Sequence, residues 1–355
     1  MNFRHTIFVI SLIVVPALPA TAASGCKPPQ VLHSMQMVPL RDGRIAVPVT
    51  FGTTPGTLIL DSADVSDPLT DRVRNKTVPI FNNRLDNYNN ILPSYAGIVG
   101  SLTMKTVQEL GLTPNNTGSR IMVGDTDRPE KKVTVQQFSF QGLPPFRTQF
   151  LVSTNEGSAA DYSGTFSINN FRQFSFDIDL DFAAGIIRFF SRDHCRRRAV
   201  DWSASTIENL TFTIDGNGYI RFPVTLDGKK LSALLDTGSP LTTLDFGYAS
   251  RRWRVRKDDP ALTKITELAD GRVVYSRPFQ SIAIGDISVM DPTIMLVPGI
   301  TGRSEGPPTG SRIDLDKRGS LPPLIIGMSV LRQLRVHIAF DEKRLYFARR
   351  EAVSP

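Results

Sequence analysis

The chain has 355 residues, of which 41% are hydrophobic and 21% are charged. This balance excludes a disordered protein, and the length is sufficient for two domains that each bury a core. The formal net charge is +7, but outside the arginine triplet 196–198 the positive residues are dispersed, so we interpret the charge as a soluble basic surface and expect no nucleic-acid partner.

The first 23 residues predict a secretory signal peptide. A short basic start, MNFRH, precedes an apolar run and then the small-residue pattern A-T-A at 20–22, which is typical of a cleavage site. Pro16 and Pro19 interrupt the apolar run, which argues against a membrane-spanning anchor. We therefore expect an exported protein, periplasmic or secreted. The residues before Cys26 weakly resemble a lipoprotein box, so a lipid anchor there is an open alternative.

Two blocks of the sequence occur twice, in the same order. Residues 43–61, GRIAVPVTFGTTPGTLILD, align without a gap with residues 218–236, GYIRFPVTLDGKKLSALLD. Residues 167–181, SINNFRQFSFDIDLD, align in the same way with residues 327–341, GMSVLRQLRVHIAFD. Ordered repetition of two blocks indicates a duplicated lobe.

Strand patterns dominate both halves. Each first block predicts two strands around a turn, at 52–56 and at 227–228, because β-branched residues alternate on both sides of the turn. Each second block continues into another strand with a terminal aromatic residue. Short helices are predicted at 101–111, with Ser101 as the N-cap, and at 329–334.

The expected organisation follows from these elements. It comprises a signal peptide over 1–23, a first lobe over 30–193, a basic connector over 194–204 and a second lobe over 205–350. The segments 66–98 and 299–320 are rich in Asn, Pro, Gly and Ser and predict loop insertions.

The chain has two cysteines, Cys26 and Cys195. An exported protein meets an oxidising compartment, which favours one disulfide between these two cysteines. Two free thiols are the alternative. Two cysteines and four scattered histidines do not make a zinc set, so we expect no metal and no cofactor.

The second lobe carries a family motif. The stretch ALLDTGSPLTTL, followed by LPPLIIGMSVLRQLRVHIAFDEKRLYF, resembles the retropepsin and pepsin family of aspartic proteases. In that family each lobe carries Asp-Thr/Ser-Gly on a tight loop, and an apolar-apolar-Gly trio crosses beneath it. The trio here is Ile325, Ile326 and Gly327. The resemblance implies an all-β, bilobal, pepsin-like fold of two duplicated acid-protease β-barrel lobes with a few short helices.

The resemblance also implies the site residues. In the second lobe Asp236 would be one catalytic aspartate, Thr237 would tie the two loops together, Gly238 would form the turn and Ser239 would hydrogen-bond the carboxylate. In the first lobe the repeat names Asp61 as the second catalytic aspartate and Ser62 as its tie. Two close carboxylates cannot both ionise, so they share a proton. The ionised one deprotonates a water molecule, and the protonated one polarises the scissile carbonyl.

The first half-site departs from the family pattern at three places. Ala63 stands where glycine is expected and adds a Cβ to a crowded loop. Asp64 stands where a small residue is usual, and a third carboxylate near the pair would raise its pKa values unless it faced solvent. The run 165–167 is Thr-Phe-Ser, so that Ser167 stands opposite Gly327. These departures bear on the activity of the first half-site, not on the fold.

Family members close a β-hairpin over the bound peptide. The candidates are the turn at Gly124 and Asp125 in the first half and the turn at Asp270 and Gly271 in the second. An ordinary surface turn is the alternative for each.

Three hypotheses about function follow. The first is an exported aspartic endopeptidase whose partner is a polypeptide substrate and for which a monomer is sufficient, because one chain carries both half-sites. The second is a catalytically impaired, protease-like peptide-binding protein of the periplasm. The third is a structural or inhibitor-receiving envelope protein without a peptide cleft.

Overall fold

The computed structural model describes residues 27–63, 94–123, 126–153, 161–172, 174, 176–215, 218–268, 271–300 and 321–349. Outside the described residues lie the expected signal peptide together with Cys26, Asp64, Gly124, Asp125 and Asp270. Within the described residues, strands dominate and only four short helices occur. The prediction of an all-β protein with a few short helices is confirmed.

The first lobe is a closed barrel. Its strands are β2 (Val38–Pro39), β3 (Ile45–Phe51), β4 (Thr54–Asp61), β5 (Ser94–Leu102), β6 (Asn115–Val123), β7 (Thr126–Phe140), β8 (Phe146–Val152) and β9 (Gly164–Ser167). They pair in the order β2-β3-β4-β9-β5-β8-β7-β6, and β7 also pairs with β3, which closes the ring. The β3–β4 turn comprises residues 52 and 53, so it is shorter than the turn predicted at 52–56, and Gly52 has φ +63°.

Phenylalanine side chains fill this barrel. Phe138 lies with its ring centroid 5.2–5.3 Å from those of Phe140, Phe146 and Phe150, and Phe140 lies 4.9 Å from Phe166. All five are buried. Such edge-to-face contacts stabilise a core beyond the area they bury. The large apolar residues of the alternating strands therefore point inward, as the pattern predicts.

The second lobe repeats this topology. Its strands are β13 (Thr213–Ile214), β14 (Ile220–Leu226), β15 (Lys229–Leu235), β16 (Thr243–Asp245), β17 (Thr263–Glu267), β18 (Val273–Pro278), β19 (Ser281–Ile284), β20 (Ile287–Met290), β21 (Thr293–Val297) and β22 (Leu324–Ile326). The order β14-β15-β22-β16-β21-β18-β17 matches β3-β4-β9-β5-β8-β7-β6, with the same parallel and antiparallel pairings. The duplicated bilobal fold is thus present in the strand pairings themselves.

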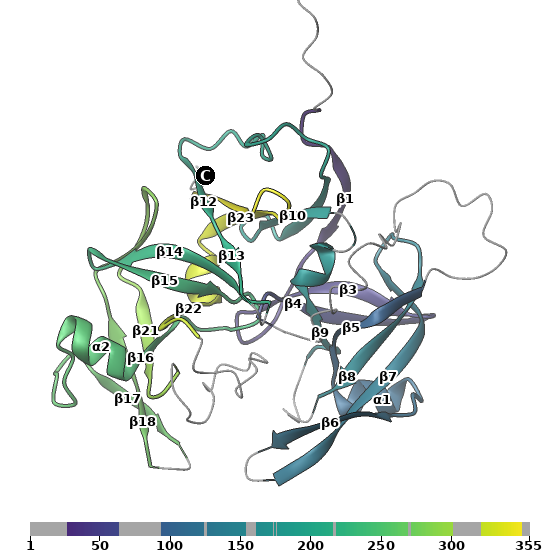
Figure 1. Ribbon diagram of the computed structural model, residues 1–355, viewed down its shortest axis with the longest axis horizontal. Helices are drawn as coiled ribbons and strands as arrows, with labels where there is room; N and C mark the ends of the chain where they lie inside the picture. Colours follow the sequence, from purple (N-terminus) through teal and green to yellow (C-terminus); the bar gives the residue numbers. More distant parts are fainter. Residues whose placement is uncertain are drawn as a thin grey trace, which may run out of the picture.

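A six-stranded sheet joins the two lobes (Figure 1). Its strands are β1 (Val31–Gln36), β10 (Phe176–Asp181), β11 (Ile186–Ser191), β12 (Ile207–Thr211), β23 (Leu334–Ala339) and β24 (Arg344–Arg349), in the order β1-β11-β10-β23-β24-β12. Ile178 pairs with Ile338, its counterpart in the repeat. Because equivalent residues face each other across an antiparallel pair, the pseudo-twofold axis that relates the lobes passes between Ile178 and Ile338.

The helices differ in detail from the prediction. They are α1 (Met104–Glu109), η1 (Ile168–Arg172), α2 (Phe246–Trp253) and α3 (Met328–Leu331). The predicted N-cap of α1, Ser101, is wrong, because Ser101 lies in β5 and its hydroxyl bonds that of Thr165, 2.9 Å away. Thr103 caps α1 by accepting from the Thr106 amide at 3.1 Å. Helix α2 was not predicted; it follows β16 as α1 follows β5, and Asp245 caps it.

Cys195 is disulfide-bonded. Its amide donates to the carbonyl of Lys27 at 2.9 Å, so the connector lies beside the first described residue of the chain. The proposed partner, Cys26, is outside the described residues.

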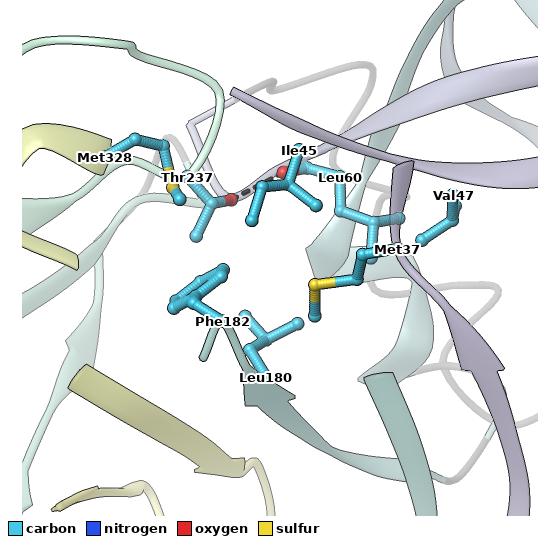
Figure 2. A pocket seen from close by; sticks show the side chains of 8 residues that line it. All are labelled: Met37, Ile45, Val47, Leu60, Leu180, Phe182, Thr237 and Met328. Atoms are coloured by element: carbon cyan, nitrogen blue, oxygen red, sulfur yellow. Dashed lines mark hydrogen bonds between the residues drawn. The ribbon is translucent and has the colours of Figure 1, made fainter. Parts of the chain in front are cut away.

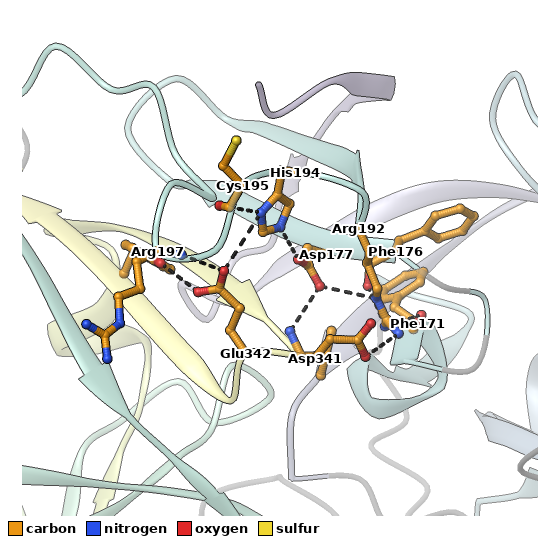
Figure 3. Close-up of polar contacts among 11 residues, drawn as sticks. Phe171, Phe176, Asp177, Arg192, His194, Cys195, Arg197, Asp341 and Glu342 are labelled. Atoms are coloured by element: carbon orange, nitrogen blue, oxygen red, sulfur yellow. Dashed lines mark hydrogen bonds and ion pairs between the residues drawn. The ribbon is translucent and has the colours of Figure 1, made fainter. Parts of the chain in front are cut away.

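Buried charges connect the lobes within the six-stranded sheet (Figure 3). Asp177 on β10 accepts a hydrogen bond from the Phe340 amide of the second lobe at 2.9 Å and pairs with Arg192 Nε at 3.2 Å. His194 Nε2 lies 3.0 Å from its other oxygen, and this hydrogen bond raises the pKa of His194. Arg192 also pairs with Asp341 at 3.0 Å. A buried carboxylate with this many partners holds the two halves in register.

His337 on β23 lies in the same sheet without polar partners among the described residues. It is fully buried, and the rings of Phe190, Trp202 and Tyr346 pack against it. Burial lowers its pKa from 6.5 to about 4. The imidazole is therefore neutral in the folded protein at pH values where the unfolded chain is protonated.

This difference predicts a loss of stability in acid. Between pH 6.5 and about 4, the unfolded chain binds a proton at His337 that the folded protein does not, so the free energy of unfolding falls by up to about 3 kcal/mol. His337→Phe should remove this contribution. Chemical denaturation at pH 7 and at pH 4.5 should show the variant gaining stability relative to wild type on acidification. If the free energies of unfolding of the variant and wild type differed by the same amount at both pH values, His337 would not be the source of the acid sensitivity.

Candidate active site

Asp61 and Asp236 occupy the same place in the two lobes. Asp61 is the last residue of β4, and Asp236 follows β15 directly. Both strands end in apolar residues that are buried on both faces, which fits strands flanked by a parallel neighbour on one side and a hairpin partner on the other. Asp61 is 1% exposed and Asp236 is 0% exposed.

A crossed set of hydrogen bonds ties the two loops together, and Figure 2 shows one of them, between Thr237 and Leu60. Thr237 Oγ1 donates to the Leu60 carbonyl at 2.6 Å and accepts from the Ser62 amide at 3.1 Å. Ser62 Oγ donates to the Leu235 carbonyl at 2.8 Å and accepts from the Thr237 amide at 3.0 Å. Each hydroxyl thus reaches the backbone of the other lobe's loop, which is the position predicted for Ser62 and Thr237. We call these four bonds the inter-loop tie.

The inter-loop tie lies over apolar surface. A small cavity separates it from the six-stranded sheet, lined by Met37, Ile45, Val47, Leu60, Leu180, Phe182, Thr237 and Met328 (Figure 2). Hydrogen bonds are stronger in such surroundings than in water, and unmade ones are more costly. The relative position of the loops is therefore strongly fixed.

The two carboxyl groups meet at one glycine. Gly238 donates its amide to Asp236 Oδ1 at 3.1 Å, and a Cβ added at Gly238 would overlap the carboxyl group of Asp61. Asp61 Oδ1 accepts from the Ala63 amide at 2.8 Å, the equivalent bond in the first loop. Both aspartates therefore lie in one buried site, where two negative charges strongly disfavour each other.

The crossing trio supports the second loop from below. Ile326 pairs with Leu235, and its carbonyl accepts from the Asp236 amide at 3.0 Å. A Cβ added at Gly327 would overlap the carbonyl oxygen of Leu241, so only glycine fits there. Ile325 and Ile326 are fully buried.

Ser239 does not have the role predicted for it. Its hydroxyl donates to the Leu241 carbonyl at 2.8 Å rather than to Asp236. A hydroxyl group can donate only one hydrogen bond, and because the chain turns after Ser239, the Leu241 carbonyl is the acceptor.

The structure accommodates two of the three departures in the first half-site, Ala63 and the run 165–167, and Asp64 lies outside the described residues. Ala63 is fully buried and belongs to an apolar cluster whose other members come from the second lobe: Tyr219, Leu234, Val274, Val297, Ile300, Leu321 and Ile325. Its methyl group therefore fills space between the lobes. Phe166 takes part in the phenylalanine core, and Ser167 pairs with Asp61 in the β4–β9 register.

Each lobe carries a hairpin at the equivalent point of its topology. In the first, Val123 of β6 pairs with Thr126 of β7, and the flap candidates Gly124 and Asp125 between them lie outside the described residues. In the second, the β17–β18 turn is closed by Leu268 and Arg272, whose amide and carbonyl lie 2.7 Å apart, and Gly271 has φ +79°. Both hairpins extend away from the six-stranded sheet (Figure 1).

Among the described residues, no group of three or more His, Cys, Asp or Glu side chains could hold a metal ion. Nor is any helix in this part of the chain long and apolar enough to cross a membrane.

The two lobes share one topology, and each presents an aspartate at the end of β4 or directly after β15, which is the arrangement that the resemblance to the aspartic proteases implies. Residues 222–330 match the family model described as "Aspartyl protease", a segment that includes the Asp236 loop and the crossing trio. The resemblance to the aspartic proteases predicted from the motifs is thereby confirmed, with the match in the second half of the chain.

The chain is also similar to a solved structure. A retropepsin-like aspartic protease from Rickettsia conorii is 17% identical and covers 42% of this chain and 95% of its own, with a TM-score of 0.28. No curated protein matches the chain significantly.

The contact at Gly238 predicts that reciprocal substitutions at two equivalent positions of the lobes change the free energy of unfolding by different amounts. Gly238→Ala forces a methyl group into the Asp61 carboxyl, which should lower the free energy of unfolding by about 1–3 kcal/mol. Ala63→Gly removes a methyl group from an apolar cluster and should cost about 1 kcal/mol or less. Urea denaturation of both variants at one pH measures the difference. If Ala63→Gly were the more damaging change, the proposed contact would be contradicted.

Proposed function

We propose that this protein is an aspartic endopeptidase whose water nucleophile is activated by Asp61 and Asp236. The observation that carries the proposal is the meeting of both carboxyl groups at Gly238, beneath which the inter-loop tie fixes the two loops. The family match of the second lobe supports the reaction class.

The chemistry requires one proton shared by two acids. The ionised carboxylate removes a proton from the water molecule as its oxygen attacks the peptide carbonyl carbon. The protonated carboxyl group gives its proton to the carbonyl oxygen. In the second step the C–N bond breaks, the carboxyl group that now holds the proton gives it to the leaving amine nitrogen, and the other carboxylate takes a proton from a hydroxyl group of the diol, so the dyad is again singly protonated. The reaction needs no covalent intermediate.

An extended polypeptide is the substrate we infer. The β6–β7 and β17–β18 hairpins project on the side of the loops opposite the six-stranded sheet, and we propose them as covers for the bound chain (Figure 1). β17 is the terminal strand of its sheet, and all five of its residues are exposed. A terminal strand offers backbone groups to an extended peptide.

We further infer that the protein is exported, to the periplasm or the outside of the cell. The A-T-A pattern at 20–22 and the disulfide at Cys195 support this, because disulfides persist in oxidising compartments. Both aspartates belong to one chain, so a monomer contains a complete site.

The direct test is cleavage of an unfolded protein library by the mature chain and by its Asp61→Asn and Asp236→Asn variants. Each variant removes one ionisable group while keeping the shape of the side chain, so each should lower kcat/KM by about 1,000-fold or more. The midpoint of denaturation controls for folding. Loss with Asp236→Asn alone would mean that Asp61 is not part of the dyad.

The pH dependence of cleavage is a second expectation. Activity should be greatest at acidic to mildly acidic pH and should fall as the shared proton is lost. Initial rates on one peptide between pH 3 and 9 measure this profile. A flat profile up to pH 9 is incompatible with a shared-proton dyad.

A second candidate function is peptide binding without catalysis. Ala63 and Ser167 favour it, because both replace glycine-type positions beside Asp61. Absence of cleavage, together with saturable binding of a peptide-mimicking aspartic-protease inhibitor, would establish this function in place of the first.

A further inference from the structure

The loop that follows Asp236 is closed by a pair of hydroxyl groups that lie outside both the Asp-Thr-Gly triplet and the crossing trio. Ser329 Oγ accepts from the Thr242 amide at 2.9 Å and donates to Thr242 Oγ1 at 3.0 Å. Thr242 Oγ1 also accepts from the Gly327 amide at 3.1 Å. Thr242 is fully buried. We call these three bonds the hydroxyl clamp.

The backbone reinforces the same closure. At the start of α3, the Met328 amide donates to the Ser239 carbonyl at 2.8 Å and the Ser329 amide donates to the Pro240 carbonyl at 3.0 Å. The hydroxyl clamp therefore joins the far end of the catalytic loop to the strand–helix crossing that supports its near end. A shift of Thr242 would be transmitted to Gly238 through only three intervening residues of chain.

The first lobe uses its equivalent residue differently. Asn169 stands where the repeat aligns it with Ser329, and its Nδ2 donates to the Gly218 carbonyl of the other lobe at 2.9 Å. The position that aligns with Thr242 is Asp67, which lies outside the described residues. The hydroxyl clamp is thus built by residues of the half-site whose Asp-Thr-Gly motif is intact.

We propose that Thr242 and Ser329 are positioning residues that hold the Asp236 carboxyl in its reactive orientation toward Asp61. The inference rests on the proposed peptidase function. Neither residue is predicted to touch the substrate, so their effect should fall on kcat and not on substrate binding. Small displacements of a catalytic group cost about 10- to 100-fold in rate.

The chain offers a matched control next to Thr242. Thr243 is also buried, at 1% exposure, but its hydroxyl has no hydrogen-bond partner among the described residues. Thr242→Val and Thr243→Val make the same chemical change one residue apart. Thr242→Ser keeps the hydroxyl and serves as the rescue variant.

The experiment measures kcat, KM and the pH–rate profile of these three variants beside wild type. Thr242→Val should lower kcat about 10- to 100-fold with KM within about twofold, and should move the pH–rate profile. Thr242→Ser should recover most of the rate, and Thr243→Val should match wild type. A kcat for Thr242→Val within about twofold of that for Thr243→Val would overturn the proposal.

Two further measurements keep the proposal testable if Thr242→Val does not fold or if the wild-type protein does not cleave peptides. If Thr242→Val does not fold, Ser329→Ala removes the partner hydroxyl and should give the same loss of kcat; a normal kcat would overturn the proposal. If wild type does not cleave, the proposed function fails, and hydrogen exchange then reads the hydroxyl clamp directly. Faster exchange of the 236–239 amides in Thr242→Val than in Thr243→Val would support positioning, and equal exchange would overturn it.

Discussion

The inter-loop tie is the interaction on which the rest of the structure depends. Two hydroxyl groups, of Ser62 and Thr237, each satisfy an amide and a carbonyl of the opposite loop in a site closed to water. An unmade hydrogen bond in such a place costs about 1–3 kcal/mol. The two lobes must therefore meet in one relative position. The carboxyl groups of Asp61 and Asp236 are brought together as a consequence of that position.

The halves have diverged where symmetry would be unfavourable. Asp177 and His337 are equivalent in the repeated blocks and face the same part of the six-stranded sheet. Two aspartates at the twofold relation would place like charges in a buried sheet. Instead, Asp177 gathers cations and a backbone amide, while His337 is neutral among aromatic rings. The sheet thus has no pair of like charges at these two equivalent positions, whereas the site has an aspartate from each lobe.

Much of the fold could be predicted from the sequence because duplication leaves a local signal. The gap-free repeat identified β3, β4, β14 and β15 and placed Asp61 opposite Asp236. What could not be predicted depends on contacts distant in the chain. Serine is a residue type that often caps helices, but the Ser101 hydroxyl forms a hydrogen bond with Thr165 in a neighbouring strand. Ser239 could not be assigned an acceptor, because the return of the loop to Leu241 is set by tertiary structure.

The central claim is that Asp61 and Asp236 form one titrating unit. Carbon-13 NMR titration of their two carboxyl carbons tests it without requiring turnover. Each signal should respond in both of two separate pH steps, and Asp61→Asn should leave Asp236 with a single step. Two independent one-step titrations, neither changed by substitution of the other residue, would contradict the account.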